Sequence, residues 1–465
     1  MNILMLNKLA LDLVARDYSK IDGRDPVNAG PTKTSRALAI IHLAARDAYA
    51  AVTKHYAPHL AAMPALPLGF VPATGIAAAL SAGFSAAEAL YPDDATYIRD
   101  QSTNFLMGAD GAEIDYGFRV AKAWMDNRFK DGAELPQLDR IYGNAPGAHR
   151  PDPLDPMQQT LGRTWGDVKP FVIASVSADA HLGPPPKLGS PVYVKEFDDV
   201  YQHGKASNPM GKPKSREAAT KGIFWGYDGS NKLGTPPRLY NQVVVATPAF
   251  QGLNASEQIN VLAAINAAMA DAGIAAWYWK YTYDRWRPVV GIRESSLGWG
   301  TTGTGDSSGN THPDPFWLPL GAPASNQNIK PNGTPGFPAY PSGHSTFGSA
   351  CFQTFACMIE KSTDDIALDF VSDEFNGITT DNHGATRPRF VDRGMTLTRA
   401  IADNSESRIF LGVHWDSDAT GGAKVGYAIA DKCVKAFKLG APDCKPVAMP
   451  SKKKRNINQH RIALT

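Results

Sequence analysis

Residues 254–288 read NASEQINVLAAINAAMADAGIAAWYWKYTYDRWRP. The run has no proline before its last position, and we predict one long helix over 254–286. Pro288 makes Arg287 a helix boundary, because the residue before a proline avoids the helical conformation. Lys280 and Arg287 are seven residues apart, so two helical turns place both cations on one face. This stretch therefore indicates a helical fold and carries the first candidate site residues.

Further helices are predicted on both sides of this one. They cover residues 1–14, 34–52, 74–91, 111–130, 342–361, 365–376, 395–411 and 414–438. Residues 132–215 are rich in Pro and Gly, with β-like pieces at 171–173 and 192–194, and we predict an irregular covering segment. The pattern as a whole predicts an all-α protein with long loops.

The overall composition narrows the function classes. The 465 residues include 47 Lys+Arg and 45 Asp+Glu, a formal net charge of +2. Nucleic acid and anionic membranes call for a concentrated basic surface, so neither is expected as a main partner. The N-terminal residues lack the basic start and cleavage site of a signal peptide, and the apolar stretch 56–87 is broken by prolines. We expect a soluble protein, with 446–465 as a solvated basic tail.

The four cysteines do not fix the redox compartment. Cys351 and Cys357 are six residues apart in a predicted helix, so they point to different faces and are not expected to bond. Cys433 and Cys444 could pair across a turn.

The stretch Tyr340 to Phe347, YPSGHSTF, is typical of an anion-binding helix start. Ser342 can cap the helix, and Gly343 lets a ligand approach the backbone. The first N–H groups of the helix then face the ligand, and the helix dipole favours negative charge there. His344 lies at this mouth, where an imidazole can hold or release a proton near neutral pH.

The stretch Ser407 to Asp418, SRIFLGVHWDSD, adds a third group of polar residues. Arg408 offers a planar fork that suits a tetrahedral oxyanion. His414 and Asp418 are four residues apart, so the carboxylate can fix the tautomer of the imidazole. Gly412 marks a turn that would let Arg408 and His414 reach one centre.

Each stretch also has a structural alternative. Asp284 could join Lys280 and Arg287 in a surface network, the second stretch could be an ordinary capped helix, and a lone His/Asp pair is often structural. Three separate stretches that each offer part of one phosphate-like site nevertheless favour a shared compact anion. The candidate donors are Lys280, Arg287, Ser342, Gly343 and Arg408, with His344 and His414 left for chemistry.

These three signatures, in this order, resemble those shared by the vanadium-dependent haloperoxidases and the acid phosphatase/phosphatidic acid phosphatase superfamily. Other pieces are similar to fungal vanadium chloroperoxidases: YDGSNKLGTPPRLYNQ from Tyr227, HPDPFWLPLGAPASN from His312 and GFPAYPSGHSTFG from Gly336. The likeness covers about 220–425, while residues 53–220 look divergent. The segment between His344 and Ser407 is shorter than in the fungal enzymes.

The resemblance implies two four-helix bundles with long connecting loops and a little β structure. It implies one helical domain over 1–445, with a divergent half 1–220 and a catalytic half 221–440. Vanadate would bind His414, with its oxygens held by the five candidate donors. His344 matches the acid/base histidine, Asp228 the aspartate that supports Arg408, and Trp277 and Phe337 two aromatic residues of the halide region.

The activity implied by the resemblance is a vanadate-dependent haloperoxidase. Chloride or bromide would be oxidised by hydrogen peroxide to hypohalous acid, which halogenates a small organic acceptor, with Lys280 polarising the peroxide and His344 taking a proton. A phosphomonoesterase with His414 as nucleophile is one alternative, and a non-catalytic anion-binding protein is another. The length of the chain and the presence of Asp228, Trp277 and Phe337 favour the haloperoxidase. The sequence predicts no oligomeric state.

Overall fold

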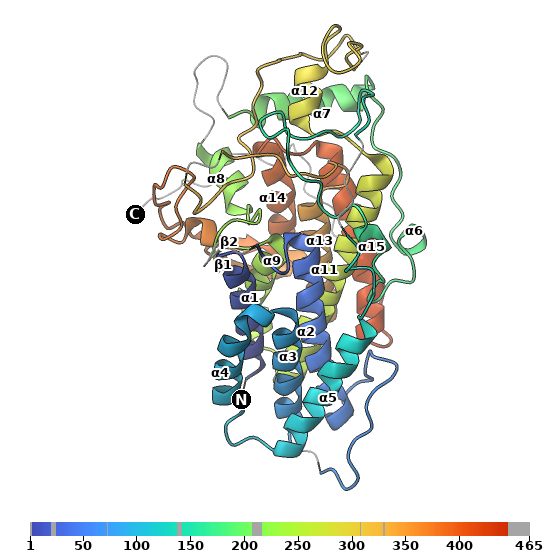
Figure 1. Ribbon diagram of the computed structural model, residues 1–465, viewed down its shortest axis with the longest axis vertical. Helices are drawn as coiled ribbons and strands as arrows, with labels where there is room; N and C mark the ends of the chain where they lie inside the picture. Colours follow the sequence, from blue (N-terminus) through green and yellow to red (C-terminus); the bar gives the residue numbers. More distant parts are fainter. Residues whose placement is uncertain are drawn as a thin grey trace.

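The computed structural model of the protein describes residues 2–19, 25–71, 73–136, 142–206, 216–306, 308–328 and 331–444 (Figure 1). The α-helices are α1 (Ile3–Asp17), α2 (Gly30–Thr53), α3 (Ile76–Leu90), α4 (Ala95–Leu106), α5 (Gly111–Asn127), α6 (Val176–Asp179), α7 (Pro191–His203), α8 (Arg216–Phe224), α9 (Pro236–Ala246), α10 (Pro248–Gln251), α11 (Ala255–Tyr283), α12 (Pro288–Glu294), α13 (Gly343–Met358), α14 (Leu397–Phe410) and α15 (Asp416–Phe437). The strands are β1 (Ala367–Phe370) and β2 (Asp392–Thr396), and short 3-10 turns include η4 (Thr363–Asp365) and η5 (Asp373–Phe375).

The helices form two groups that share one hydrophobic core. Helices α1, α2, α3 and α5 pack together in the lower part of Figure 1, and α11, α13, α14 and α15 form the second group. Helix α2 packs along α11 and so joins the two groups. Buried residues of both belong to one continuous cluster. The predicted all-α class is confirmed, with an antiparallel pair of β1 and β2 as the named sheet of the described residues.

Helix α11 is the longest element of the core. Asn254 and Glu257 form a capping box at its start, and Asp284, with φ of 52°, ends it in the left-handed conformation. By length and composition α11 could cross a membrane, yet 94% of its most apolar window is buried inside the protein. Its environment is therefore that of a core helix, and its last turn delivers Lys280 to the interior.

Two local predictions are wrong. Residues 365–376 form a strand between two 3-10 turns, because side chains alternate between exposed and buried and β1 pairs with β2. Residues 192–194 lie in α7, because Ser190 caps the helix and Pro191 occupies its first position. Tyr193, Phe197 and Val200 then recur at helical spacing on the buried face. Helices α4, α6, α8, α9, α10 and α12 were not predicted.

The segment before α6 is irregular, as predicted for the Pro/Gly-rich region, and it is anchored to α11. The Asp271 carboxylate accepts the backbone N–H groups of Phe171, Val172 and Ile173 at 2.7 to 2.9 Å. Asp271 is fully buried, and these three bonds satisfy an otherwise costly buried charge. The covering segment is thus attached to the core helix that carries the site.

Cys444 pairs with Cys357, so the suggested pairing of Cys433 with Cys444 is wrong. The bond joins the end of α13 to the segment that follows α15. Cys433 is a free, buried thiol on α15. The predicted basic tail, 446–465, lies outside the described residues.

Candidate active site

The ends of five helices bring the predicted site residues together. Lys280 lies in the last turn of α11, Arg287 caps α12, and Arg408 lies in the last turn of α14. The remaining residues lie at two helix starts: Ser342, Gly343 and His344 at α13, and His414 and Asp418 at α15. Helices α11, α13 and α15 pack against one another, which places these ends side by side.

Gly412 forms the turn between α14 and α15. Its φ is +72°, and a Cβ there would lie 2.5 Å from the carbonyl oxygen of Gly204 and 2.9 Å from the ring of Trp317. Only glycine fits both this conformation and this space. The turn lets Arg408 and His414 face the same centre, as the sequence predicted.

Lys280 and Arg287 are buried, with exposed fractions of 0% and 1%. A surface network with Asp284 is therefore excluded. Arg287 donates from Nε to the carbonyl oxygen of Phe337 at 2.9 Å and from Nη1 to that of Val413 at 2.8 Å. Its Nη2 is buried and has no hydrogen-bond partner.

Arg408 is also fully buried and is held by Asp228. Its Nη1 and Nη2 donate to the two carboxylate oxygens of Asp228 at 3.0 and 2.8 Å, a bidentate pair. Its Nε is buried without a partner. Within the part of the chain that the structure describes, Arg287 Nη2 and Arg408 Nε thus both lack a hydrogen-bond acceptor.

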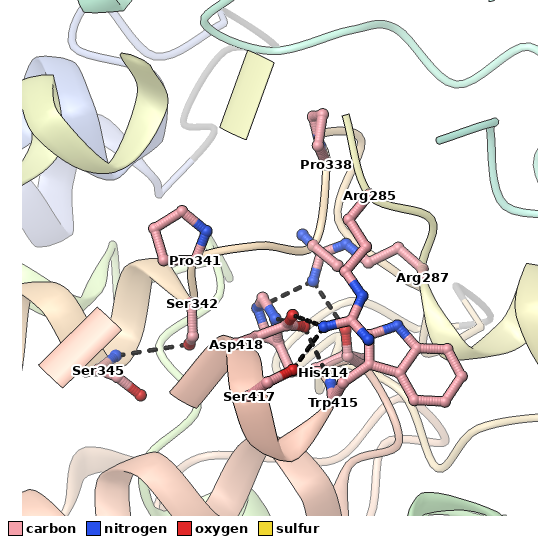
Figure 2. Close-up of polar contacts among 12 residues, drawn as sticks. Arg285, Arg287, Pro338, Pro341, Ser342, Ser345, His414, Trp415, Ser417 and Asp418 are labelled. Atoms are coloured by element: carbon pink, nitrogen blue, oxygen red, sulfur yellow. Dashed lines mark hydrogen bonds and ion pairs between the residues drawn. The ribbon is translucent and has the colours of Figure 1, made fainter. Parts of the chain in front are cut away.

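His414 has a defined tautomer. Its Nδ1 donates to Asp418 Oδ2 at 2.9 Å, and its Nε2 accepts from Arg287 Nη1 at 2.9 Å (Figure 2). The lone pair of the neutral imidazole therefore lies on Nε2, on the side of the arginine. Burial, with Arg287 as the next cause, lowers the pKa of His414 well below its usual value.

Lys280 is held by backbone carbonyl groups of the segment before α13. Its ammonium donates to the carbonyl oxygens of Pro338, Ala339 and Pro341 at 2.8, 3.1 and 2.5 Å. All three donors of the ammonium are thereby used, so Lys280 orients the segment that leads into Ser342. Burial and the neighbouring Arg287 lower the pKa of Lys280 well below its usual value.

The start of α13 presents donors to the same centre. Ser342 Oγ accepts the N–H of Ser345 at 3.5 Å, and its own N–H donates to the carbonyl oxygen of Asp418 at 2.8 Å (Figure 2). Gly343 and His344 are the first helical residues, so their N–H groups have no partner within the helix. The turn is therefore built as predicted, and it is tied directly to α15.

His344 donates from Nε2 to the carbonyl oxygen of Gly226 at 2.8 Å, which leaves the lone pair on Nδ1. Burial, together with Arg408, lowers the pKa of His344 to about 3. Titration near neutral pH was expected from the sequence. The imidazole is instead neutral at that pH, because it is desolvated and lies near Arg408.

Arg285, Glu196 and Ser417 complete the site and were missed by the sequence analysis. Arg285 donates from Nη1 to Asp418 Oδ1 at 3.2 Å (Figure 2). It also forms a buried ion pair with Glu196. Glu196 also accepts the N–H and hydroxyl of Ser417 at 3.0 and 2.6 Å. Glu196 comes from α7, which was predicted to be irregular, so no local signal linked it to His414.

An aromatic wall stands beside these cations. The ring centroids of Trp277 and Phe337 are 4.8 Å apart, and those of Trp277 and Phe347 are 6.2 Å apart. Phe337 also lies 5.0 Å from Lys280 Nζ and 5.0 Å from the guanidinium carbon of Arg287. Cations over a ring face are attracted by its negative charge, so the wall contributes to holding them.

A cavity of about 620 Å³ opens onto the site. Its inner end is formed by Gly343, His344, Arg408 and His414, and its wall includes Trp277 and Phe337. The structure therefore brings all the predicted site residues to one place.

The donor set fits a tetrahedral oxyanion such as vanadate or phosphate. Arg287 Nη2 and Arg408 Nε are buried donors without partners, and such groups carry a free-energy cost unless a ligand accepts from them. The lowered pKa values of Arg287, to about 9, and of Lys280 result chiefly from burial and partly from neighbouring cations. A bound anion relieves that repulsion.

Comparison with known proteins agrees with this geometry. Residues 260–439 match the family model of the vanadium chloroperoxidase (VCPO) second helical-bundle domain. The matched residues include Lys280, Arg287, His344, Arg408 and His414, whereas Asp228 and Glu196 lie outside them.

The chain is 35% identical over 281 residues to the vanadium chloroperoxidase of Curvularia inaequalis. The match covers 53% of the chain but only 44% of that enzyme, so the chain spans less than half the length of this relative. The predicted resemblance to fungal vanadium chloroperoxidases is confirmed.

Solved structures share the fold of this chain beyond residues 260–439. A bacterial vanadium-dependent iodoperoxidase superposes with a TM-score of 0.70 at 22% identity, over 94% of this chain and 97% of its own. A holo-type bacterial vanadium-dependent chloroperoxidase gives 0.62 at 18% identity, over 90% and 95%. The divergence over residues 53–220 is thus one of sequence, because the fold is shared over nearly the whole chain.

Proposed function

We propose that the protein is a vanadate-dependent haloperoxidase that oxidises chloride or bromide with hydrogen peroxide to hypohalous acid. The hypohalous acid then halogenates an organic acceptor. The observation that carries this proposal is the pair of unpartnered, buried N–H groups of Arg287 and Arg408 beside the Nε2 lone pair of His414. The similarity of this half of the chain to a vanadium chloroperoxidase supports it. We also propose that residues 1–445 act as one domain, supported by the shared core.

In this proposal His414 Nε2 is the single protein ligand of vanadium. Arg287, Arg408, Ser342, Gly343 and Lys280 would hold the vanadate oxygens. Vanadate, when bound, supplies a Lewis-acidic centre that activates hydrogen peroxide at a constant oxidation state. Arg287 Nη1, which now donates to His414 Nε2, must transfer this hydrogen bond to an anion oxygen.

The role of each support follows from its contacts. Asp228 fixes the guanidinium of Arg408, and Asp418 fixes the tautomer of His414. His344 keeps the lone pair of Nδ1, which would accept a proton from peroxide once a bound anion offsets the charge of Arg408 that lowers its pKa. Lys280 contributes its positive charge, and it contacts an anion directly only if one of its three carbonyl partners is released.

The halide region is assigned to Trp277 and Phe337. Both line the cavity next to His414, and Phe337 contacts two buried cations. A halide at this wall would be desolvated and would lie near positive charge, which attracts it. Because desolvation costs less free energy for an anion of low charge density, such an anion is favoured there.

The test combines orthovanadate, hydrogen peroxide and bromide or chloride, with phenol red as acceptor for bromide. We expect halogenation that needs vanadate and is suppressed by phosphate, which competes for the same donors. His414→Ala should lose vanadate binding. His344→Ala should retain vanadate but lose most turnover, by about 10²–10⁴-fold for a general acid or base.

A phosphomonoesterase uses the same donors, so both activities are measured on one preparation. Efficient hydrolysis of a phosphate monoester without halogenation would show that His414 is a nucleophile toward phosphorus. Vanadate binding without either activity would indicate an anion-binding protein.

A further inference from the structure

The cavity at the site is far larger than the anion chemistry needs. Its volume is about 620 Å³. A water molecule occupies roughly 30 Å³, and a halide or peroxide is of the same order. Pockets of about 300–1,000 Å³ are those that enclose organic ligands. Most of the space is therefore available to a molecule other than peroxide or halide.

The inner part of the cavity has a fixed aromatic wall. Trp277 Nε1 donates to the carbonyl oxygen of Leu161 at 3.1 Å, and a Cβ on Gly162 would lie 2.3 Å from that nitrogen. On the other side a Cβ on Gly343 would lie 3.3 Å from the same ring. The indole is thus fixed between two glycines, and only 1% of it is exposed. Phe337 packs against the indole at 4.8 Å between ring centroids and is only partly buried, so it is the ring that faces the cavity. A fixed ring of this kind suits a stacked or edge-on aromatic ligand.

The outer part is lined by segments that the anion site does not use. They come from the start of α2, from residues 152–161, and from residues 322–327 and 331–336. Pro31, Leu154, Ala322 and Pro323 give this part an apolar lining. An apolar lining favours a ligand whose surface is also apolar, because its burial removes that surface from water.

Acidic side chains in the lining determine which ligand charge the cavity favours. Asp152 and Asp155 also line the cavity. Asp152 is held in place by the N–H groups of Leu154 and Thr334, which donate to its carboxylate at 2.9 and 2.8 Å. An acceptor that carries its own negative charge would be repelled there. The lining therefore favours a neutral molecule.

We propose that this cavity binds a neutral, electron-rich aromatic acceptor and that halogenation takes place beside the anion site. The proposal rests on the haloperoxidase function. Hypohalous acid, formed at the inner end, gives its halogen to a ring carbon as the C–X bond forms and the O–X bond breaks. The oxygen leaves with the proton of that ring carbon as water. The aromatic acceptor and hypohalous acid thus become the aryl halide and water.

The first measurement is binding of 1-naphthol to the vanadate-loaded protein by calorimetry, without peroxide. We expect saturable binding at one site. 1-Naphthoate, the same ring system with a carboxylate, should bind about 10-fold more weakly, about 1.4 kcal/mol. Equal binding of the two probes would overturn the assignment to neutral acceptors, and no saturable binding of 1-naphthol would overturn the proposal whatever the activity is.

The second measurement is the ratio of 2-bromo- to 4-bromo-1-naphthol at low conversion, compared with the ratio from reagent hypobromous acid. Orientation in the cavity should change the ratio by at least about threefold. Leu154→Trp and Ala322→Trp fill the outer cavity and should restore the reagent ratio, with bromide-dependent peroxide consumption unchanged. Met157→Trp is the matched control, because Met157 lies on the same segment as Leu154, is 88% exposed and does not line the cavity.

The two proposals fail in different ways. A wild-type ratio equal to the reagent ratio, with peroxide consumption intact, overturns the acceptor site alone. The acceptor site is also overturned if both filling variants keep the wild-type ratio. Saturable naphthol binding without any bromide-dependent peroxide consumption overturns the haloperoxidase function and leaves an aromatic-binding cavity.

Discussion

Arg285 provides the sharpest test of how the site is held. It is 4% exposed and forms ion pairs with Glu196 and Asp418, both buried. Arg285→Met leaves two buried carboxylates without this counter-charge. Removal of one partner from a buried pair costs about 3–5 kcal/mol of folding stability. We therefore expect a large loss in the free energy of unfolding.

The same change should weaken vanadate binding through His414. Burial raises the pKa of Asp418 to about 6, and Arg285 is the main group that opposes this rise. Without Arg285 the pKa of this carboxyl group rises further, so a larger fraction is neutral at pH 7 and its support of the imidazole weakens. Loss of such a support typically costs 10–100-fold in affinity, roughly 1.4–2.7 kcal/mol.

Equilibrium dialysis of orthovanadate at pH 7, with vanadium quantified in each chamber, measures this effect directly. The double variant Arg285→Met/Glu196→Gln no longer carries the unpaired charge of Glu196. It should therefore recover part of the free energy of unfolding lost in Arg285→Met, but not the vanadate affinity. The control is Arg238→Met, because Arg238 is paired with Asp373 away from the anion site. Wild-type vanadate affinity in a folded Arg285→Met protein would refute the reasoning.

Three further predictions concern other supports of the fold and site. Asp228→Asn should lower vanadate affinity by about 10–100-fold, measured by the same dialysis, because its bidentate arginine is released. His42 is buried and its pKa is lowered to about 4, so the unfolded chain binds more protons between pH 6.5 and 4. Stability should fall by about 3 kcal/mol as pH drops through that window, and urea unfolding of His42→Gln should show a smaller fall. Cys357→Ser opens the bond to Cys444, which closes a loop with a sequence separation of 87, and should cost about 4–5 kcal/mol in thermal or urea unfolding.

Each of these has a contradicting result. Unchanged vanadate affinity in Asp228→Asn would mean that its arginine needs no carboxylate to stay oriented. An equal acid sensitivity of wild type and His42→Gln would assign the pH effect to other groups. A Cys357→Ser protein as stable as Cys433→Ser, a substitution of the free thiol, would show that the disulfide does not stabilise the fold.

The secondary structure was predicted best where the sequence pattern was local and strong. The helix over 254–286 and the capped start at Ser342 depend on neighbouring residues, and both occur close to their predicted bounds. The left-handed turn at Gly412 is of the same kind. The prediction failed at 365–376, where alternate burial against β2 decided the structure, and at α7, where the cap at Ser190 was overlooked.

The donors of the site were predictable, but their hydrogen-bond partners were not. Spacing placed Lys280 and Arg287 on one face, yet the three carbonyl groups that hold Lys280 come from another segment. Glu196 reaches Arg285 only because α7 packs on α12 and α15. Such contacts between distant segments follow from tertiary packing, which one sequence does not display. The protonation of His344 likewise depends on burial among cations rather than on its own motif.

The most direct measurement of the central claim is a crystal structure of the protein loaded with orthovanadate. We predict one vanadium centre bonded to His414 Nε2, with its oxygens accepting from Arg287 Nη2 and Arg408 Nε. The His414→Ala protein, soaked in the same way, should lack that centre. Vanadate bound away from His414, or bound equally well in His414→Ala, would contradict the account.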